Sequence, residues 1–188
     1  MKLSGAYQIN LEKQKVWDAL NDPDVLKKSI PGCEDFKKNS DTEFTATATN
    51  KIGPFNASFT GQIKLKDINA PHSYIIEGNG NSPVGFATGE AKVKLENHDG
   101  GTKLIYDVEA NVGGKIAQVG SRLIDMTAKK MADIFFGKFS ELVSNKTDIL
   151  KTEKASDARV PREKKPFNKI LIYSLLIIII TIIIYSIS

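Results

Sequence analysis

The residues that most often carry out catalysis are few in this chain and poorly placed for it. The sequence has one cysteine, Cys33, and two histidines, His72 and His98. A nucleophilic cysteine needs a neighbouring base, and a zinc site needs three or four ligands. Each histidine falls in a predicted turn, with no cysteine, histidine or carboxylate at the spacing of a ligand pair. We therefore expect no metal site, a buried structural Cys33 and solvated histidines.

Two other catalytic patterns also fail. The glycine-rich stretch 78–85 does not have the G-x-G-x-x-G spacing of dinucleotide sites, and it leads into a strand pattern rather than a helix. Acidic residues on the predicted helices, such as Glu12 and Asp18, fit solvated helix charges better than a paired acid and base. We therefore predict that the protein is not an enzyme.

The most unusual feature of the composition is the apolar C-terminus. Residues 170–188 contain no charged residue and are dominated by isoleucine. Nineteen residues of helix span about 28 Å, close to the roughly 30 Å of a bilayer's hydrocarbon core. A buried core helix would show a polar stripe, and a signal peptide would lie at the other end of the chain. The segment is predicted to be a transmembrane tail anchor.

The net charge of +4 lies beside this segment, because the residues before position 159 sum to zero. This distribution argues against a nucleic-acid-binding surface on the globular part. A basic collar next to a membrane span marks the cytoplasmic side and attracts anionic lipid. The predicted membrane-surface residues are Arg159, Arg162, Lys164, Lys165 and Lys169.

These observations predict how the chain is divided into parts and where the protein is located in the cell. Residues 1–145 form a globular ligand-binding domain, 146–169 a flexible basic linker, and 170–188 the anchor. The first residues, MKLSGAY, contain no apolar signal region, and a single cysteine suits a reducing compartment. We expect a single-pass protein of the inner (cytoplasmic) membrane with its domain in the cytoplasm.

Alternating apolar residues indicate an antiparallel sheet between residues 43 and 112. The clearest stretch is 55–65, and 87–95 and 104–112 repeat its two-residue period. The connections are too short for parallel crossovers. A strand over residues 3–9 and two short helices come first, and the second helix begins at Asp22-Pro23. After Gly113-Gly114 the spacing predicts a long helix over 115–145.

Small residues dominate the face of this sheet that is predicted to point inward. They let the helix approach closely, or they leave a hollow. Small residues on the helix itself, Gly120 and Ala128, and aromatic residues that can wall an apolar pocket both favour the hollow. The small inward residues are Ala46, Ala48, Ala57, Gly61, Gly78, Ala87, Gly89, Ala91 and Ala110. The candidate ligand-binding residues are Phe44, Phe59, Tyr74, Phe86, Ala91, Tyr106, Val108, Gly120, Leu123, Thr127, Met131 and Phe135.

Several strings in residues 1–145 match one known family. They are WDALNDP (17–23), IPGC (30–33), IGP (52–54), FATG (86–89) and GKIAQVGSRLI (114–124). With the order of elements, they resemble the carbon monoxide dehydrogenase G-subunit family, which belongs to the START and Bet v 1-like helix-grip superfamily. The resemblance implies an α+β helix-grip fold. In that fold a curved antiparallel meander wraps around a long C-terminal helix, here followed by a linker and one transmembrane helix.

The resemblance also implies a function. It suggests a membrane-tethered shuttle that binds a respiratory quinone as an exchangeable ligand, has no covalently bound cofactor, and serves a molybdenum hydroxylase of the carbon monoxide dehydrogenase type. The residues predict the hollow and the anchor, whereas the quinone and the partner enzyme come from the resemblance. The alternative is a recruiter that docks such an enzyme at the membrane without a ligand. An enzyme is a third possibility, since cyclases and hydrolases have the same fold, but the fold alone does not establish a function.

Overall fold

The computed structural model describes the backbone of residues 1–157 and the side chains of residues 1–144. Residues Met1–Lys151 form one compact unit. The elements are β1 Lys2–Ile9, α1 Lys13–Leu20, α2 Pro23–Ser29, β2 Cys33–Lys38, β3 Glu43–Ile52, β4 Phe55–Asn69, β5 Ser73–Ser82, β6 Gly85–His98, β7 Gly101–Gly113, the 3₁₀ helix η1 Lys115–Val119 and α3 Ser121–Asp157.

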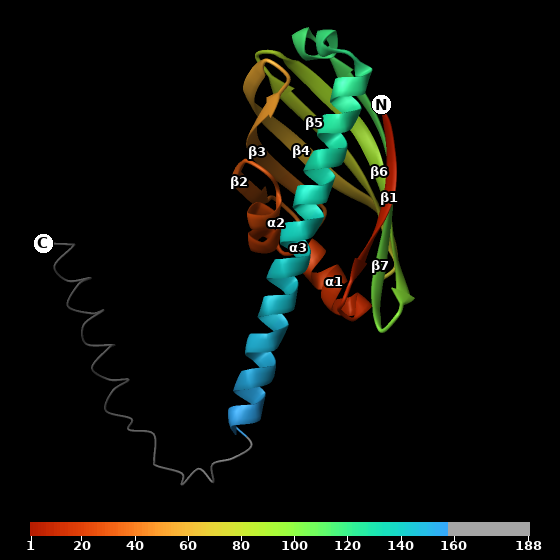
Figure 1. The fold of residues 1–188 in the computed structure, drawn as a ribbon, viewed down its shortest axis with the longest axis vertical. Helices are drawn as coiled ribbons and strands as arrows, with labels where there is room; N and C mark the ends of the chain where they lie inside the picture. The colour runs from red at the N-terminus through yellow and green to blue at the C-terminus, as the bar shows by residue number, and fades with distance from the viewer. Residues whose placement is uncertain (158–188) are drawn as a thin grey trace, which may run out of the picture. The chain divides into compact units, whose positions relative to one another are not determined.

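All seven strands form one antiparallel sheet in the order β1-β7-β6-β5-β4-β3-β2. Strands β2 to β7 are a simple meander, and β1 pairs with β7 at its far edge. The sheet curves around α3, which lies across its inner face, and α1 and α2 lie beside the same helix (Figure 1). The curved antiparallel sheet and C-terminal helix confirm the predicted helix-grip architecture.

The predicted membrane anchor, 170–188, lies outside the described residues. Helix α3 continues to Asp157, into the first part of the segment predicted as a linker, and the rest of that segment is also outside the description. Among the residues that are described, no helix combines the length and the apolar character needed to cross a bilayer.

The strand register gathers six of the nine predicted small inward residues, together with Gly80, into two neighbouring rows across the sheet. Facing residues in neighbouring strands lie side by side on one face of the sheet. A row of small side chains therefore leaves a depression in that face. One row is Ala46, Gly61, Gly80 and Ala87. The other is Gly78, Gly89 and Ala110.

Large residues fill the opposite end of the inner face. Ile9, Val16, Leu95, Leu104 and Phe139 are at most 2% exposed and belong to one hydrophobic cluster. Phe139 belongs to α3, as do Phe136 and Val143 of the same cluster. Helix α3 is therefore packed into the core over residues 135–143, whereas its first turns lie opposite Gly80 and Ala87 of the first row.

The prediction of one continuous helix from residue 115 is wrong. Gly120 has φ +89° and separates η1 from α3, which begins at Ser121. A positive φ is incompatible with a right-handed helix, and glycine adopts it without a steric penalty. Gly120 is exposed, and a Cβ added to it would meet no atom within 4 Å, so it does not contact the sheet.

The Pro31-Gly32 string lies between α2 and β2 and is hydrogen-bonded to β3. Gly32 has φ +67°, and a Cβ on it would lie 2.0 Å from the carbonyl oxygen of Thr49. The Thr49 amide donates to the Gly32 carbonyl at 2.9 Å, and Asn50 Nδ2 donates to the Pro31 carbonyl at 3.1 Å. Only glycine fits this close approach, which gives the string a structural role.

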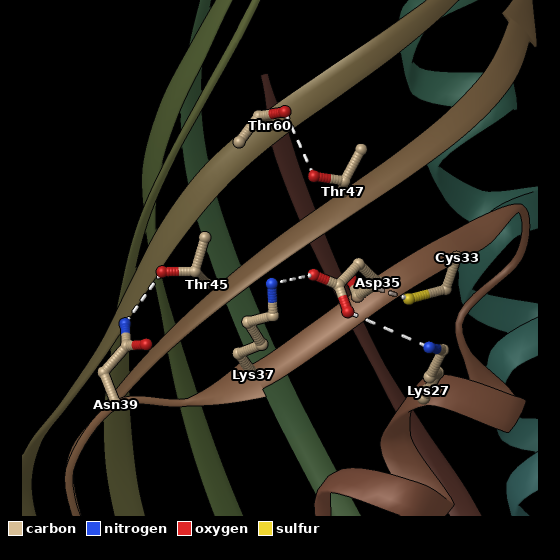
Figure 2. Close-up of polar contacts among 8 residues, drawn as sticks. All are labelled: Lys27, Cys33, Asp35, Lys37, Asn39, Thr45, Thr47 and Thr60. Carbon is tan, nitrogen blue, oxygen red and sulfur yellow. Dashed lines mark hydrogen bonds and ion pairs between the residues drawn. The ribbon is translucent and has the colours of Figure 1, made fainter.

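The outer face of the sheet is polar. The hydroxyls of Thr47 and Thr60 lie 3.1 Å apart across β3 and β4, and Asn39 Nδ2 donates to Thr45 Oγ1 at 2.8 Å (Figure 2). This contrast between faces agrees with the alternation in the sequence, and it places the apolar surface of the sheet under α3.

Candidate ligand-binding site

An apolar cavity lies between the first turns of α3 and the sheet, and its lining includes Gly80 and Ala87 of the first small-residue row. We name it the end pocket, and its volume is about 270 Å³. A Cβ added to Gly80, one of its lining residues, would meet nothing within 4 Å. The small residues therefore leave a hollow here. The lining residues are Ala48, Asn50, Ile52, Phe59, Gly80, Phe86, Ala87, Val112, Ile116, Ile124, Thr127, Ala128 and Met131.

A second cavity of about 190 Å³, the core pocket, lies further along the same face. Strands β3 and β4 contribute to both pockets, since Phe44 and Ile63 line this one and Ala48 and Phe59 line the end pocket. The core pocket is lined by Leu20, Leu26, Ile30, Phe36, Phe44, Ile63, Leu65, Tyr74, Ile76, Val93, Leu104, Phe135 and Phe136.

A larger depression of about 540 Å³ lies on the outer face and is not a candidate for an apolar ligand. Its lining includes the charged side chains of Glu43, Lys64, Glu77 and Glu90. Apolar ligands bind in sites with few polar groups. The inner pockets are therefore the candidates for an apolar ligand, despite their smaller volumes.

Seven of the twelve predicted ligand-binding residues line one of the two inner pockets. The end pocket contains Phe59, Phe86, Thr127 and Met131. The core pocket contains Phe44, Tyr74 and Phe135. Phe86 is 41% exposed and lies at the rim. Four of the five aromatic residues predicted to wall a pocket, Phe44, Phe59, Tyr74 and Phe86, therefore line one, and Tyr106 does not.

The other five predicted residues line neither inner pocket. Ala91 faces Ile76 and Val108 in the sheet, and Val108 packs against the core cluster. The ring of Tyr106 stacks on Phe136, with centroids 5.6 Å apart. The remaining two are Gly120, which is exposed, and Leu123, which lies against Gly53 in the turn between β3 and β4.

Asn50, one of two polar side chains in the end pocket, was not among the residues predicted from the sequence. It lies on β3 in the same alternating series as Ala46 and Ala48, and that series was the available signal. A polar residue at an inward position is unusual enough to mark a site. Thr127, the other polar side chain, was predicted from its place on the helix.

Both polar side chains of the end pocket are already hydrogen-bonded to the backbone. Thr127 Oγ1 donates to the carbonyl oxygen of Leu123 at 2.8 Å, within α3. Asn50 Nδ2 donates to the carbonyl of Pro31. Within the described side chains, no buried nitrogen or oxygen lacks a hydrogen-bond partner. The end pocket is thus an apolar cavity with two polar side chains, one on the sheet and one on α3, each held by a hydrogen bond to the backbone.

Helix α3 is fastened to β1 beside the core pocket. The Tyr7 hydroxyl donates to a carboxylate oxygen of Asp133, and the Tyr7 ring stacks on Phe136 at a centroid distance of 4.1 Å. Burial, and after it the hydrogen bond and charge of Asp133, raise the pKa of Tyr7 above its ordinary value. This contact holds the helix where the large core residues begin.

Burial also raises the pKa of Tyr74, which is 5% exposed and packs edge-on against Trp17. The folded state keeps this phenol protonated, whereas the unfolded chain releases its proton near pH 10. The stability from this effect is complete below about pH 10 and is lost as the pH rises through the folded-state pKa. We expect the free energy of unfolding to fall above pH 10 by about 1.4 kcal/mol per pH unit for each such tyrosine.

Tyr74→Phe tests this expectation because it keeps the ring and removes the titration. Urea unfolding at several values from about pH 8 to pH 11, followed by Trp17 fluorescence, measures the slope. The free energy of unfolding of the variant should decline less steeply with pH than that of the wild type, and Tyr7 and Tyr106, whose pKa values are also raised, should contribute to the remaining slope. Equal slopes in the two proteins would contradict the assignment to Tyr74.

Cys33 is half-buried, not buried as predicted, but its surroundings favour a structural role. Its thiol donates to the carbonyl oxygen of Asp35 at 3.4 Å, and burial raises the pKa of the thiol (Figure 2). Lys37 and Lys27 pair with the Asp35 carboxylate at 2.9 and 3.9 Å. Reactive cysteines have a lowered pKa. In residues 1–144, no group of three histidine, cysteine or acidic side chains is arranged to hold a metal ion.

Solved structures share this fold. A conserved protein from Geobacillus kaustophilus is 28% identical, with a TM-score of 0.73, over 77% of this chain and 96% of that one. Ara h 8.0201 is 15% identical, with a TM-score of 0.55, over 77% and 98% of the two chains. The Zhui aromatase/cyclase from Streptomyces sp. R1128 is 10% identical, with a TM-score of 0.55, over 78% and 95%. The last two show the fold alone. No curated protein matches the chain.

The sequence profile of the carbon monoxide dehydrogenase G-subunit (CoxG) family matches residues 5–144. This range includes every residue that lines the end pocket and the core pocket. It covers most of the chain and the whole of the seven-stranded sheet apart from the first residues of β1. The chain therefore belongs to the CoxG family.

Proposed function

We propose that the protein is a membrane-tethered carrier of a respiratory quinone. The observation that carries this proposal is the pair of apolar pockets between the sheet and α3, of about 270 and 190 Å³. Membership of the CoxG family and the helix-grip fold support binding of a hydrophobic ligand. A quinone has an apolar isoprenoid tail and a ring with two polar oxygens, which suits pockets with few polar groups.

The energetics favour an affinity that permits exchange. Burial of apolar ligand surface contributes about 25 cal/mol per Å², and association costs at least about 4 kcal/mol. The net affinity is then modest, and a tether compensates by supplying a local concentration in the millimolar range. A carrier must release its ligand as readily as it binds it, so weak binding beside the membrane suits the task.

The anchor and the partner complete the proposal. The apolar residues 170–188 and the basic residues that precede them would hold the domain at the cytoplasmic face of the inner membrane. The family name points to a molybdenum hydroxylase of the carbon monoxide dehydrogenase type as the partner enzyme. The carrier would exchange quinone between that enzyme and the bilayer.

Analysis of the co-purifying lipids tests the proposal. The full chain is purified in mild detergent from a quinone-producing host, washed, and extracted with organic solvent for mass spectrometry. We expect quinone in the extract at a level well above that in a detergent-matched control membrane protein. If no quinone or other lipid is retained, and none binds on addition, the carrier function is wrong. Continued attachment of the enzyme to membranes would then identify a recruiter.

A further inference from the structure

We propose that the end pocket binds the quinol form of its ligand more tightly than the quinone form. This inference rests on the proposed function and adds the redox state that the pocket prefers. The two forms have nearly the same shape, but a quinone oxygen can only accept a hydrogen bond, whereas a quinol hydroxyl also donates one. The polar groups that face the ligand therefore decide between them.

The pocket offers polar side chains on two opposite walls. Asn50 comes from β3 and Thr127 from α3, and the other eleven lining residues are apolar or glycine. The two oxygens of a para-quinone lie on opposite sides of its ring. A ring that enters the pocket can therefore direct one oxygen toward each wall.

Thr127 is the polar side chain of α3 that lines the pocket, and its hydroxyl oxygen is the acceptor that this inference assigns to the ligand. A hydroxyl has one proton and two lone pairs, and the proton of Thr127 is engaged with the Leu123 carbonyl at 2.8 Å. A quinol hydroxyl can donate to the remaining lone pairs without disturbing that bond. A quinone carbonyl would meet an acceptor, unless the threonine gives up its helix bond to turn its proton toward the ligand. Two acceptors facing each other in an apolar pocket are unfavourable.

Asn50 does not discriminate between the two forms. Its bond from Nδ2 to the Pro31 carbonyl uses one N–H and leaves the second N–H and the Oδ1 acceptor. The side chain can therefore serve a quinone oxygen or a quinol hydroxyl. The difference in affinity between the forms rests on Thr127.

Preference for quinol has a consequence for the direction of transport. An enzyme that reduces quinone with two electrons and two protons releases quinol. A pocket that prefers quinol removes this product from the enzyme more effectively than it delivers the oxidised substrate. The bilayer, which dissolves both forms, then receives the reduced one.

Anaerobic binding measurements test the preference. The full chain in detergent is titrated with a naphthoquinone that bears one isoprene unit, and with its chemically reduced quinol. We expect about tenfold tighter binding of the quinol. The midpoint potential of the bound couple should then lie about 30 mV above that of the free couple in the same micelles. Thr127→Val, which keeps the shape and removes the acceptor, should abolish the difference, and Thr127→Ser should retain it.

The possible outcomes separate this inference from the proposed function. Equal affinities in the wild type, or tighter binding of the quinone, would overturn the preference and leave the carrier function standing. Selectivity that survives in Thr127→Val would also overturn it, because the acceptor would not be its source. Failure to bind either form would overturn the carrier function and the preference together.

Discussion

Replacing Ala128 with phenylalanine is expected to reduce the quinone content of the purified protein at least tenfold while the domain stays folded. Ala128 is half-buried on α3 and lines the end pocket. A larger side chain in a close-packed core costs about 1–3 kcal/mol of stability. Here the added ring enters a cavity of about 270 Å³, so it displaces the ligand instead of packed neighbours.

Mass spectrometry of extracted lipid measures the ligand, and thermal unfolding monitored at Trp17 measures the fold. Ala117→Phe is the matched control, because Ala117 is exposed on η1 and lines neither inner pocket. Ala87→Phe fills the same pocket from the sheet, and it tests whether the ligand occupies the end pocket if Ala128→Phe folds poorly. Full quinone content in a folded pocket-filling variant would show that the ligand does not occupy the end pocket.

The sheet and its small-residue rows could be predicted because both depend on short-range patterns. In β4, the alternation of Phe59, Gly61 and Ile63 with polar residues fixes which face is buried, and antiparallel pairing then places facing residues together. The start of α2 at Pro23 after Asp22 follows equally from local chemistry, since the Asp22 carboxylate accepts from the first free amides.

The features that could not be predicted from the sequence depend on backbone geometry or on contacts between residues far apart in the chain. Apolar spacing continues through Gly120, so periodicity could not reveal the positive φ that separates η1 from α3. Tyr7 and Asp133 lie 126 positions apart in the chain, and only the folded structure shows that they meet. Small residues are compatible with a hollow or with a close contact, and only the folded structure distinguishes the two.

Phe139→Ala is expected to lower the free energy of unfolding by about 3–5 kcal/mol, the usual cost of removing a buried aromatic ring. Phe139 has no exposed surface, belongs to the main hydrophobic cluster, and stacks on Phe135 at a centroid distance of 5.8 Å. A typical domain is stable by about 5–15 kcal/mol, so the loss is a large part of the total. Lys138→Ala, at an exposed neighbouring position, should change stability by less than about 0.5 kcal/mol.

Urea unfolding of the full chain in detergent, followed by Trp17 fluorescence, measures this loss. Together with the ligand content, it also tests whether one part of α3 holds the helix on the core while another part lines the end pocket. Phe139 fastens the helix to the core and lines neither inner pocket, whereas Ala128 faces the end pocket. Phe139→Ala should therefore lower stability first and ligand content as a consequence, and lower temperature should restore the ligand. Ala128→Phe should lose the ligand at every temperature without a loss of stability. A change of less than about 1 kcal/mol in Phe139→Ala would mean that other contacts hold the helix over the pockets.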